Sequence, residues 1–280
     1  MPNLNWAEPK DHTELFSGCA SVTRGEMQEG RSVFAYDIVY NSEFMDIMTP
    51  QGFALAIYAV LNTKRAGGLT LAPVCSTWVF MSRGSTLRSR ARPLGSGKGS
   101  CHIGSVMAAR CAILLLLAAR GLFWILEHPK GSLFQYHPLI QHVLGLIKFS
   151  RKHIRMGDYG GHSQKPTWLY SGHGEILDEL DKFKPLRTPV REKHELVEKY
   201  VDGKGKSRIK GSSNLKSSQT YPLQFGRALA RLRTRRMKDI KKTSKAFVKQ
   251  SPQSVAKKRT GSLSVWIDMA NLQPVFDYLS

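Results

Sequence analysis

The most constraining feature of this sequence is an unbroken apolar run at residues 122–126, Leu-Phe-Trp-Ile-Leu. A strand with no polar residue on either face has to be covered on both faces, which is typical of a parallel sheet with helices on each side. The largely apolar segment before it, at residues 105–119, has the length of a buried helix, and Gly121 separates the two. The run therefore predicts an α/β architecture.

Strand-like and helix-like segments alternate along the first 175 residues. The expected strands are 13–18, 32–38, 69–74, 122–126, 150–156 and 167–171, and the expected helices are 19–28, 51–65, 105–119 and 137–147. This alternation predicts a doubly wound, mostly parallel, Rossmann-like sheet with helices on both faces. Residues 82–104 are rich in Gly, Ser and Arg and predict a long loop; a charged helix is expected at 176–200 and a linker at 204–218.

The positive charge is concentrated toward the C-terminus. Residues 204–259 hold 18 of the 42 Lys and Arg residues and one of the 21 acidic residues, in a chain of net charge +21. A polyanionic partner or a nuclear address is one interpretation, and an unspecific basic tail is the other. We expect a first domain at residues 1–175, a helical and linker segment that closes it at 176–236, and a basic, poorly ordered tail at 237–280.

Cysteine usage and hydropathy favour an intracellular protein. The four cysteines lack the pattern of a disulfide framework, and the sequence has no CxxC or HxxxH pair, so we expect neither disulfides nor a metal site. No signal-peptide pattern is visible at the N-terminus. The apolar segment at 112–126 is interrupted by Arg120 and is too short to span a bilayer, so we expect no membrane association.

Chemically suggestive residues stand at the ends of the expected strands. Ser17 and Gly18 follow the first strand, Asp37 ends the second, Cys75 ends the third, and Glu127 follows the apolar strand. Ligands of doubly wound sheets lie beyond the carboxyl ends of the strands. We therefore expect these residues to line one cleft.

Each of these residues also has a structural alternative. The small-residue turn at 16–21 does not match GxGxxG and is either a ligand-binding turn or a plain tight turn. Asp37 either accepts hydrogen bonds from ribose hydroxyls or is a surface or capping residue. Cys75 is either a nucleophile or a small buried residue, and Glu127 either contacts a ring nitrogen of a base or pairs with an arginine of the long loop.

Basic residues near the expected cleft are candidates for contacts to nucleic-acid phosphates, and a merely solvated basic loop is the alternative. The candidates are Arg83, Arg88, Arg90, Arg92 and Lys98 in the long loop, and Lys165 in the turn before the last strand.

The segments LFSGCASVTRG, VFAYDI, LAPVCSTW, WILEHPKGS and YGGHSQKPTWLYS, in this order, resemble the class I S-adenosyl-L-methionine-dependent methyltransferases, and among them the DNA (cytosine-5) branch. The whole pattern is most similar to a group of uncharacterised algal and dinoflagellate proteins. The resemblance spans about residues 13–232. It implies S-adenosyl-L-methionine as the cofactor and nucleic acid as the partner, with DNA favoured over RNA, and it is compatible with a nuclear location.

The resemblance also implies residue roles on the cofactor side. Phe16, Ser17 and Gly18 would line the methionine end of S-adenosyl-L-methionine, and Asp37 would hold its ribose.

On the substrate side, the resemblance implies that Cys75 attacks C6 of cytosine and that Glu127 engages N3, with the base flipped out of its duplex. The sequence departs from this branch at Val74 and His128, and Lys165 stands where an arginine-containing element is usual. A large target-recognition region is also absent. A catalytically inactive, methyltransferase-like nucleic-acid-binding or interaction module is therefore the second hypothesis.

Overall fold

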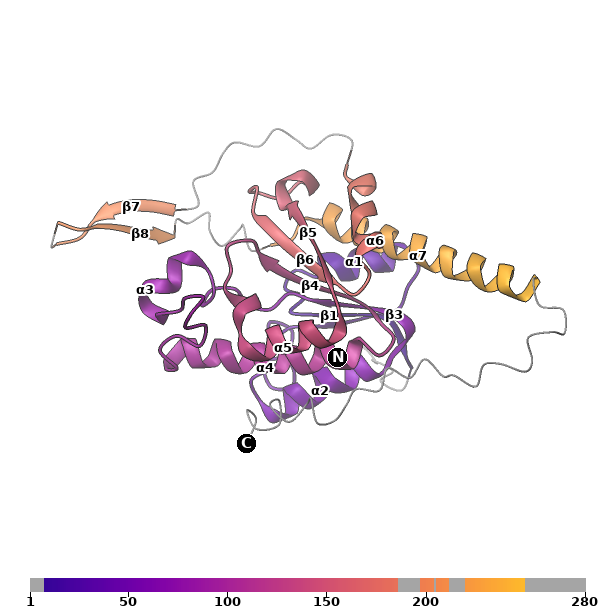
Figure 1. Cartoon of the computed structure of the whole chain (residues 1–280), viewed down its shortest axis with the longest axis horizontal. Helices are drawn as coiled ribbons and strands as arrows, with labels where there is room; N and C mark the ends of the chain where they lie inside the picture. The colour runs from indigo at the N-terminus through magenta and orange to yellow at the C-terminus, as the bar shows by residue number, and fades with distance from the viewer. Residues whose placement is uncertain (1–7, 186–196, 204, 212–219, 250–280) are drawn as a thin grey trace. The chain divides into compact units, whose positions relative to one another are not determined.

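A single six-stranded sheet organises the computed structural model, which describes residues 8–185, 197–203, 205–211 and 220–249 (Figure 1). Its strands are β1 (Lys10–Leu15), β2 (Val33–Tyr36), β3 (Thr63–Leu71), β4 (Phe123–Pro129), β5 (Ser150–Arg155) and β6 (Pro166–Ser171). They lie in the order β2-β1-β3-β4-β6-β5. The β1–β2, β1–β3 and β3–β4 pairs are parallel, whereas β6 runs antiparallel to both β4 and β5.

The strand order reverses between β1 and β3, because the chain first winds from β1 to β2 and then continues on the other side of β1. The carboxyl ends of two adjacent strands that diverge in this way frame the crevice in which doubly wound sheets bind ligands. Here the backbone N–H of Ala72 donates to the carbonyl of Leu15 at 3.3 Å, so the loops after β1 and β3 start side by side. The predicted doubly wound, mostly parallel, Rossmann-like sheet is confirmed.

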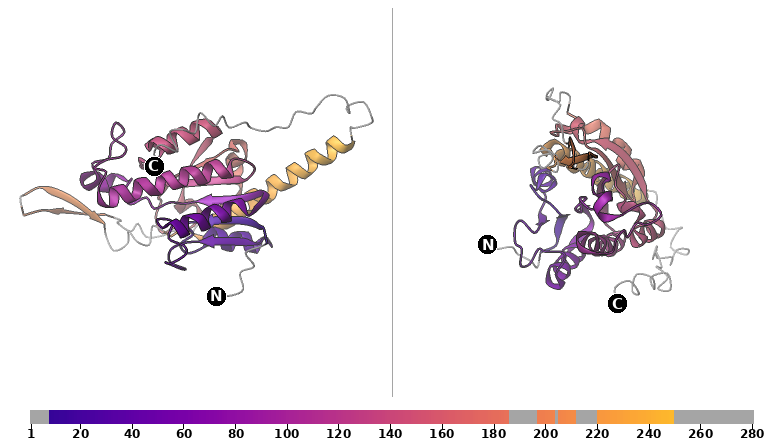
Figure 2. Two further views of the ribbon diagram at one scale, coloured as in Figure 1. Left: turned by 90° about the horizontal axis from the view of Figure 1, so that it is seen from below. Right: turned by 90° about the vertical axis from the view of Figure 1, so that its left-hand side faces the viewer.

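Helices cover both faces of the sheet (Figure 2). On one face lie α2 (Pro50–Leu61), α4 (Gly99–Ala118) and α5 (Pro138–Ile147), and on the other lie α1 (Ser21–Gln28), α6 (Gly174–Asp178) and the first part of α7 (Leu223–Lys249). Among the described helices, α4 is long and apolar enough to cross a membrane, but half of its residues are buried inside the fold.

A continuous apolar core lies on the face of the sheet that α1, α6 and the first part of α7 cover. Its buried members come from α1, β4, β5, β6, the segments that follow β5 and β6, and α7: Val22, Phe123, Ile125, Ile154, Met156, Tyr159, Leu169, Leu177, Leu180, Phe225, Ala228, Leu229 and Leu232. Two glycines allow α1 and α7 to approach closely. A Cβ on Gly25 would overlap the backbone of Gly226, and a Cβ on Gly226 would overlap the carbonyl of Ser21.

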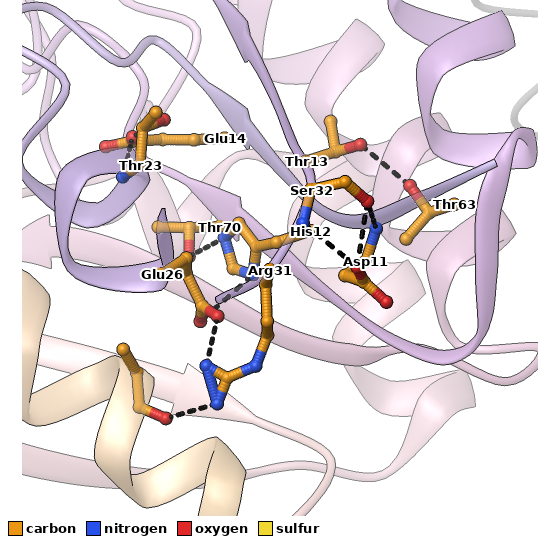
Figure 3. A network of polar contacts seen from close by, with 11 residues as sticks. Asp11, His12, Thr13, Glu14, Thr23, Glu26, Arg31, Ser32, Thr63 and Thr70 are labelled. Carbon is orange, nitrogen blue, oxygen red and sulfur yellow. Dashed lines mark hydrogen bonds and ion pairs between the residues drawn. The ribbon is translucent and has the colours of Figure 1, made fainter. Parts of the chain in front are cut away.

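A buried polar network ties these helices to the sheet (Figure 3). The ring of His12 on β1 lies between Thr70 Oγ1, 3.2 Å from Nε2, and Glu26 Oε1, 3.4 Å from Nδ1. Glu26 also pairs with Arg31 at 2.8 Å, and Arg31 donates a second hydrogen bond to the carbonyl of Ala230 at 2.9 Å. Removing one partner of a buried ion pair costs roughly 3–5 kcal/mol, so this network fixes α1 and α7 against β1 and β3.

Several predicted element boundaries were wrong. The helix expected at 51–65 ends at Leu61, because Thr63 already pairs with Lys10 of β1 and its hydroxyl bonds back to the carbonyl of Ala59. The loop expected at 82–104 is shorter, since α3 (Arg83–Thr86) forms at its start and α4 begins at Gly99.

The prediction of one charged helix over residues 176–200 was also wrong, because the helical structure ends earlier. After α6 and a short 3₁₀ segment that ends at Phe183, the next described element is a strand, β7 (Val197–Val201). It pairs with β8 (Ser207–Gly211), inside the segment expected to be a linker. The rest of these two predictions, at 186–196, 204 and 212–218, lies outside the described residues.

The chain divides into two compact units, residues 1–232 and 233–280. The first contains the sheet and its covering helices. In the second, α7 continues to Lys249, past the predicted boundary at residue 236. The remainder of the predicted basic tail, 250–280, lies outside the described residues.

Candidate functional site at the carboxyl ends of β1, β3 and β4

The turn after β1 has an unusual backbone. Phe16, Gly18 and Ala20 all have positive φ angles, of 62°, 50° and 55°. For the two residues that carry a side chain, this conformation is strained and is found where the surrounding structure enforces it, often at ligand sites. A Cβ on Gly18 would meet no atom within 4 Å, so the backbone at this point faces open space.

Asp37, which directly follows β2, is bound to this turn. Its Oδ2 accepts a hydrogen bond from the Gly18 backbone N–H at 2.7 Å, and its Oδ1 accepts one from the Val39 N–H at 3.1 Å. The hydroxyl of Tyr40 donates to the carbonyl of Gly18 at 2.7 Å. A carboxylate oxygen can accept more than one hydrogen bond, so Asp37 holds the turn and keeps capacity for a ligand hydroxyl.

Glu127 lies inside β4 rather than after it, and it is only 2% exposed. Its Oε2 accepts a hydrogen bond from the hydroxyl of Tyr221, and its Oε1 lies 3.5 Å from Nζ of Lys165. The alternative of a pair with a loop arginine is thus replaced by a pair with a lysine from the turn before β6. A buried carboxylate with two such partners is compensated for its lost hydration.

Cys75 lies in the turn after β3, and its thiol is partly buried. Burial raises the pKa of this thiol, the charge of Lys165 lowers it, and the charge of Glu127 raises it. Cys75 and Glu127, separated by 52 positions in the sequence, therefore share one electrostatic environment. In the absence of substrate the raised pKa keeps Cys75 as a thiol, so a nucleophilic role needs a proton acceptor close by.

Tyr221 joins the two halves of the site and was not predicted. Its backbone carbonyl accepts hydrogen bonds from Ser21 Oγ at 2.6 Å and from the thiol of Cys19 at 3.7 Å, at the end of the turn after β1. Its ring lies 4.9 Å from Lys165 Nζ, and its hydroxyl reaches Glu127. The Gly18–Asp37 side and the Cys75–Glu127 side thus meet through one residue.

The pKa of Tyr221 is raised well above its usual value, first by burial and then by the neighbouring Glu127 carboxylate. The phenol therefore keeps its proton and acts as a hydrogen-bond donor. The sequence analysis assigned no role to Tyr221. Only the tertiary structure brings it next to a carboxylate 94 positions away.

The residues around Gly18 and Asp37 fit the adenosine part of S-adenosyl-L-methionine. The open backbone at Gly18 can approach a ligand closely. Directly after Asp37, Ile38 and Val39 are 50% and 70% exposed and offer apolar surface to a purine. Bound there, the cofactor would supply an electrophilic methyl group.

The basic loop residues do not act as one group. Arg88 was interpreted as a nucleic-acid contact, but it is 2% exposed and its guanidinium stacks on Trp78 at 3.5 Å from the ring centroid. It donates hydrogen bonds to the carbonyl of Cys101 at 2.6 Å and to Ser105 Oγ at 3.1 Å. Arg88 thus organises the loop, and that interpretation is corrected.

The other residues that were predicted to contact nucleic-acid phosphates lie nearer the surface. Arg83 is partly buried, with its guanidinium 5.3 Å from the ring centroid of the exposed Phe80. Arg90 is exposed and lies over Tyr136 at 5.4 Å, and Lys98 is exposed directly before α4. Lys165 points toward Glu127, so it is a residue of the site itself.

His128, which follows Glu127, is a packing residue. Its ring stacks on Phe134 with centroids 4.4 Å apart, and burial lowers the pKa of His128 to about 3. Within the described residues, no group of three or more His, Cys, Asp or Glu side chains could hold a metal ion.

Comparison with known proteins adds little to this geometry. No family model matches the sequence, and no curated protein matches it. Among solved structures, the S. pombe Dnmt2 methyltransferase is similar, with a TM-score of 0.33 and 13% sequence identity over 66% of this chain and 57% of that chain. The chain therefore spans less than two thirds of that protein, and none of these comparisons supports the predicted closeness to algal and dinoflagellate proteins. The fold assignment depends on the strand order and on the helices that cover both faces.

Proposed function

We propose that this protein is an S-adenosyl-L-methionine-dependent methyltransferase that acts on nucleic acid, with C5 of cytosine in DNA as its target. The observation that carries the proposal is the convergence of Cys75, Glu127 and Lys165 at the β1–β3 crevice, next to the turn held by Gly18 and Asp37. A thiol beside a carboxyl group suits attack on a ring carbon with protonation of a ring nitrogen.

In the proposed reaction, the thiol of Cys75 gives its proton to the carboxylate of Glu127, which passes it to N3 of the flipped cytosine as the sulfur forms a bond to C6. Lys165 favours both events, because its positive charge stabilises the thiolate and the carboxylate that remains after proton transfer. The addition makes C5 nucleophilic toward the methyl group of the cofactor. Loss of the C5 proton to water and departure of the sulfur then restore the aromatic ring, and the N3 proton returns through Glu127 to the sulfur of Cys75.

The proposal is tested by methyl transfer from radiolabelled S-adenosyl-L-methionine to separate pools of DNA, RNA and protein. We expect incorporation into DNA that disappears in Cys75→Ala and persists in Ser76→Ala, a change of similar size in the same turn at an exposed position. Incorporation only into protein would contradict the proposed substrate. Absence of cofactor binding in calorimetry, together with no incorporation into any pool, would overturn the proposed activity.

A second candidate is a catalytically inactive nucleic-acid-binding module. It is favoured by the engagement of both Glu127 oxygens within the chain, by Tyr221 and Lys165, and by the raised pKa of Cys75. This candidate predicts salt-sensitive nucleic-acid binding that survives Cys75→Ala, with no methyl transfer. Methyl incorporation that depends on Cys75 would exclude it.

A further inference from the structure

A row of cations and aromatic rings lies on the face of β4 and β6 opposite the face that carries Glu127. We call it the basic–aromatic track and define it by Arg90, Gln135, Tyr136, Arg151, Trp168 and Lys130. Side chains alternate between the two faces of a strand. In the β4–β6 register Glu127 faces Leu169, whereas the next residue, His128, faces Trp168. The strands that build the site therefore also build the track.

Trp168 is the centre of the track. The guanidinium of Arg151 lies 4.5 Å from its ring centroid, and Nζ of Lys130 lies 5.9 Å from it. The ring of His153, directly opposite on β5, approaches at 5.3 Å in an edge arrangement. Lys130 is held in place by its backbone N–H, which donates to the carbonyl of Pro166 at 2.9 Å.

The track continues from Trp168 toward the long loop. Arg151 donates a hydrogen bond to Gln135 Oε1 at 3.1 Å, on the 3₁₀ segment η2 (Phe134–Tyr136). The neighbouring Tyr136 carries Arg90 over its ring at 5.4 Å. Three exposed cations, from the loop, from β5 and from the end of β4, are thus each placed against an aromatic ring.

Nearby carboxylates neutralise other cations. Among the described residues, Asp178 and Asp181 pair with Lys152, on the opposite face of β5 from Arg151, at 3.8 and 2.6 Å. Asp158 pairs with Arg155 at 3.5 Å. The charges of Lys130 and Arg151 are directed to aromatic rings and an amide, so they stay available to an external anion.

We infer that the basic–aromatic track binds single-stranded nucleic acid, with its cations on phosphates and a base stacked against the Arg151–Trp168 pair. Cations interleaved with aromatic side chains are the usual surface for single strands, because every base has a face that can stack and every linkage carries a charge. A duplex hides its base faces and gains only the phosphate contacts. The inference rests on the proposed function in taking nucleic acid as the partner, and it places that partner on the face of β4 and β6 opposite Glu127.

The test measures binding of the full-length protein to a fluorescent oligothymidylate of about 12 nucleotides, a length in the usual range of single-strand sites, by anisotropy over a range of salt concentrations. The basic C-terminal segment contributes equally in every variant, so differences report the track. We expect Lys130→Gln/Arg151→Gln to weaken binding by about tenfold and to reduce the slope of log K against log salt by ~1.4, about 0.7 for each lost phosphate contact on a single strand. The control is Arg65→Gln/Arg120→Gln, which removes two exposed charges at the opposite end of β3 and β4 and should leave both quantities unchanged.

Trp168→Leu separates stacking from charge. We expect it to weaken binding by at least about fivefold while the salt slope stays the same. Both charge variants alter exposed side chains, so they remain informative if Trp168→Leu fails to fold. Equal affinities for the track and control variants, tighter binding to a duplex of the same sequence, or equal competition by polyglutamate would overturn the inference. Failure of cofactor binding with track-dependent oligonucleotide binding intact would instead contradict only the proposed methyltransferase activity.

Discussion

Replacing Tyr221 with Phe removes one buried hydroxyl and leaves the rest of that residue in place. The hydroxyl donates to the carboxylate of Glu127, which is 2% exposed. A hydrogen bond to a charged group contributes about 1.5–3 kcal/mol to stability. Phe keeps the ring contact with Phe225, at a centroid distance of 5.5 Å, and the backbone carbonyl bonded to Ser21. We therefore expect Tyr221→Phe to lower the free energy of unfolding by about 2 kcal/mol.

The matched control is Tyr36→Phe. Tyr36 is 1% exposed, and its hydroxyl donates to an uncharged acceptor, the carbonyl of Gly52, at 2.9 Å. A neutral hydrogen bond contributes about 1 kcal/mol, so the control should lose about half as much stability. Urea unfolding measures both losses as shifts of the midpoint at constant m. Equal losses in the two variants, or a stabilised Tyr221→Phe, would refute the claim that Tyr221 donates to an ionised carboxylate.

Other consequences of the structure can be measured in the same way. Gly226→Ala should destabilise the protein by about 1–3 kcal/mol or more, because its Cβ would overlap the carbonyl of Ser21. Gly145→Ala, with no atom within 4 Å of the new Cβ, should stabilise α5 by up to ~1 kcal/mol; the reverse order in urea unfolding would contradict the close approach of α1 and α7. Burial raises the pKa of Glu14 from 4.5 to about 7, so the folded state holds an extra proton between these values and stability falls as pH rises through them. Between pH 4.5 and 7.5 the wild type should lose up to about 3 kcal/mol relative to Glu14→Gln, and parallel stability curves would refute this. Lys165→Met should slow alkylation of Cys75 by iodoacetamide, because the lysine charge lowers the pKa of that thiol; mass spectrometry of the Cys75 peptide measures the rate, and an unchanged rate would show that the charge does not act there.

The sheet could be predicted because its signals are local. The run at residues 122–126 is apolar on both faces, and burial on both faces requires helices on each side. The crevice could be predicted for a related reason. In parallel strands all carboxyl ends lie at one edge, so the loops after β1 and β3 start side by side, and Gly18 is hydrogen-bonded to Asp37.

Long-range contacts decided the features that sequence reasoning missed. Residues 62–65 extend a helical pattern, but pairing of Thr63 with Lys10 on β1 makes them part of a strand. Arg88 belongs to a glycine-rich basic segment whose composition predicts exposure to solvent. In the structure it is buried, because it stacks on Trp78 and donates to the carbonyl of Cys101 and to Ser105 Oγ on α4. In each example the local pattern is ambiguous and the partner comes from another element.

Tyr221 is the residue at which the two functional hypotheses separate. If Glu127 takes part in catalysis, its Oε2 must be released when a ring nitrogen arrives, and the hydroxyl of Tyr221 then has to move or to share that oxygen. The backbone carbonyl of Tyr221 is bonded to Ser21, so that rearrangement takes place against the turn that holds Gly18 and Asp37. If the protein is inactive, the bond to Glu127 is a permanent compensation for a buried charge and no ligand competes for it. An active enzyme should therefore keep methyl transfer in Tyr221→Phe with an altered pH profile, whereas in an inactive protein the same change lowers stability and leaves nucleic-acid binding as it was.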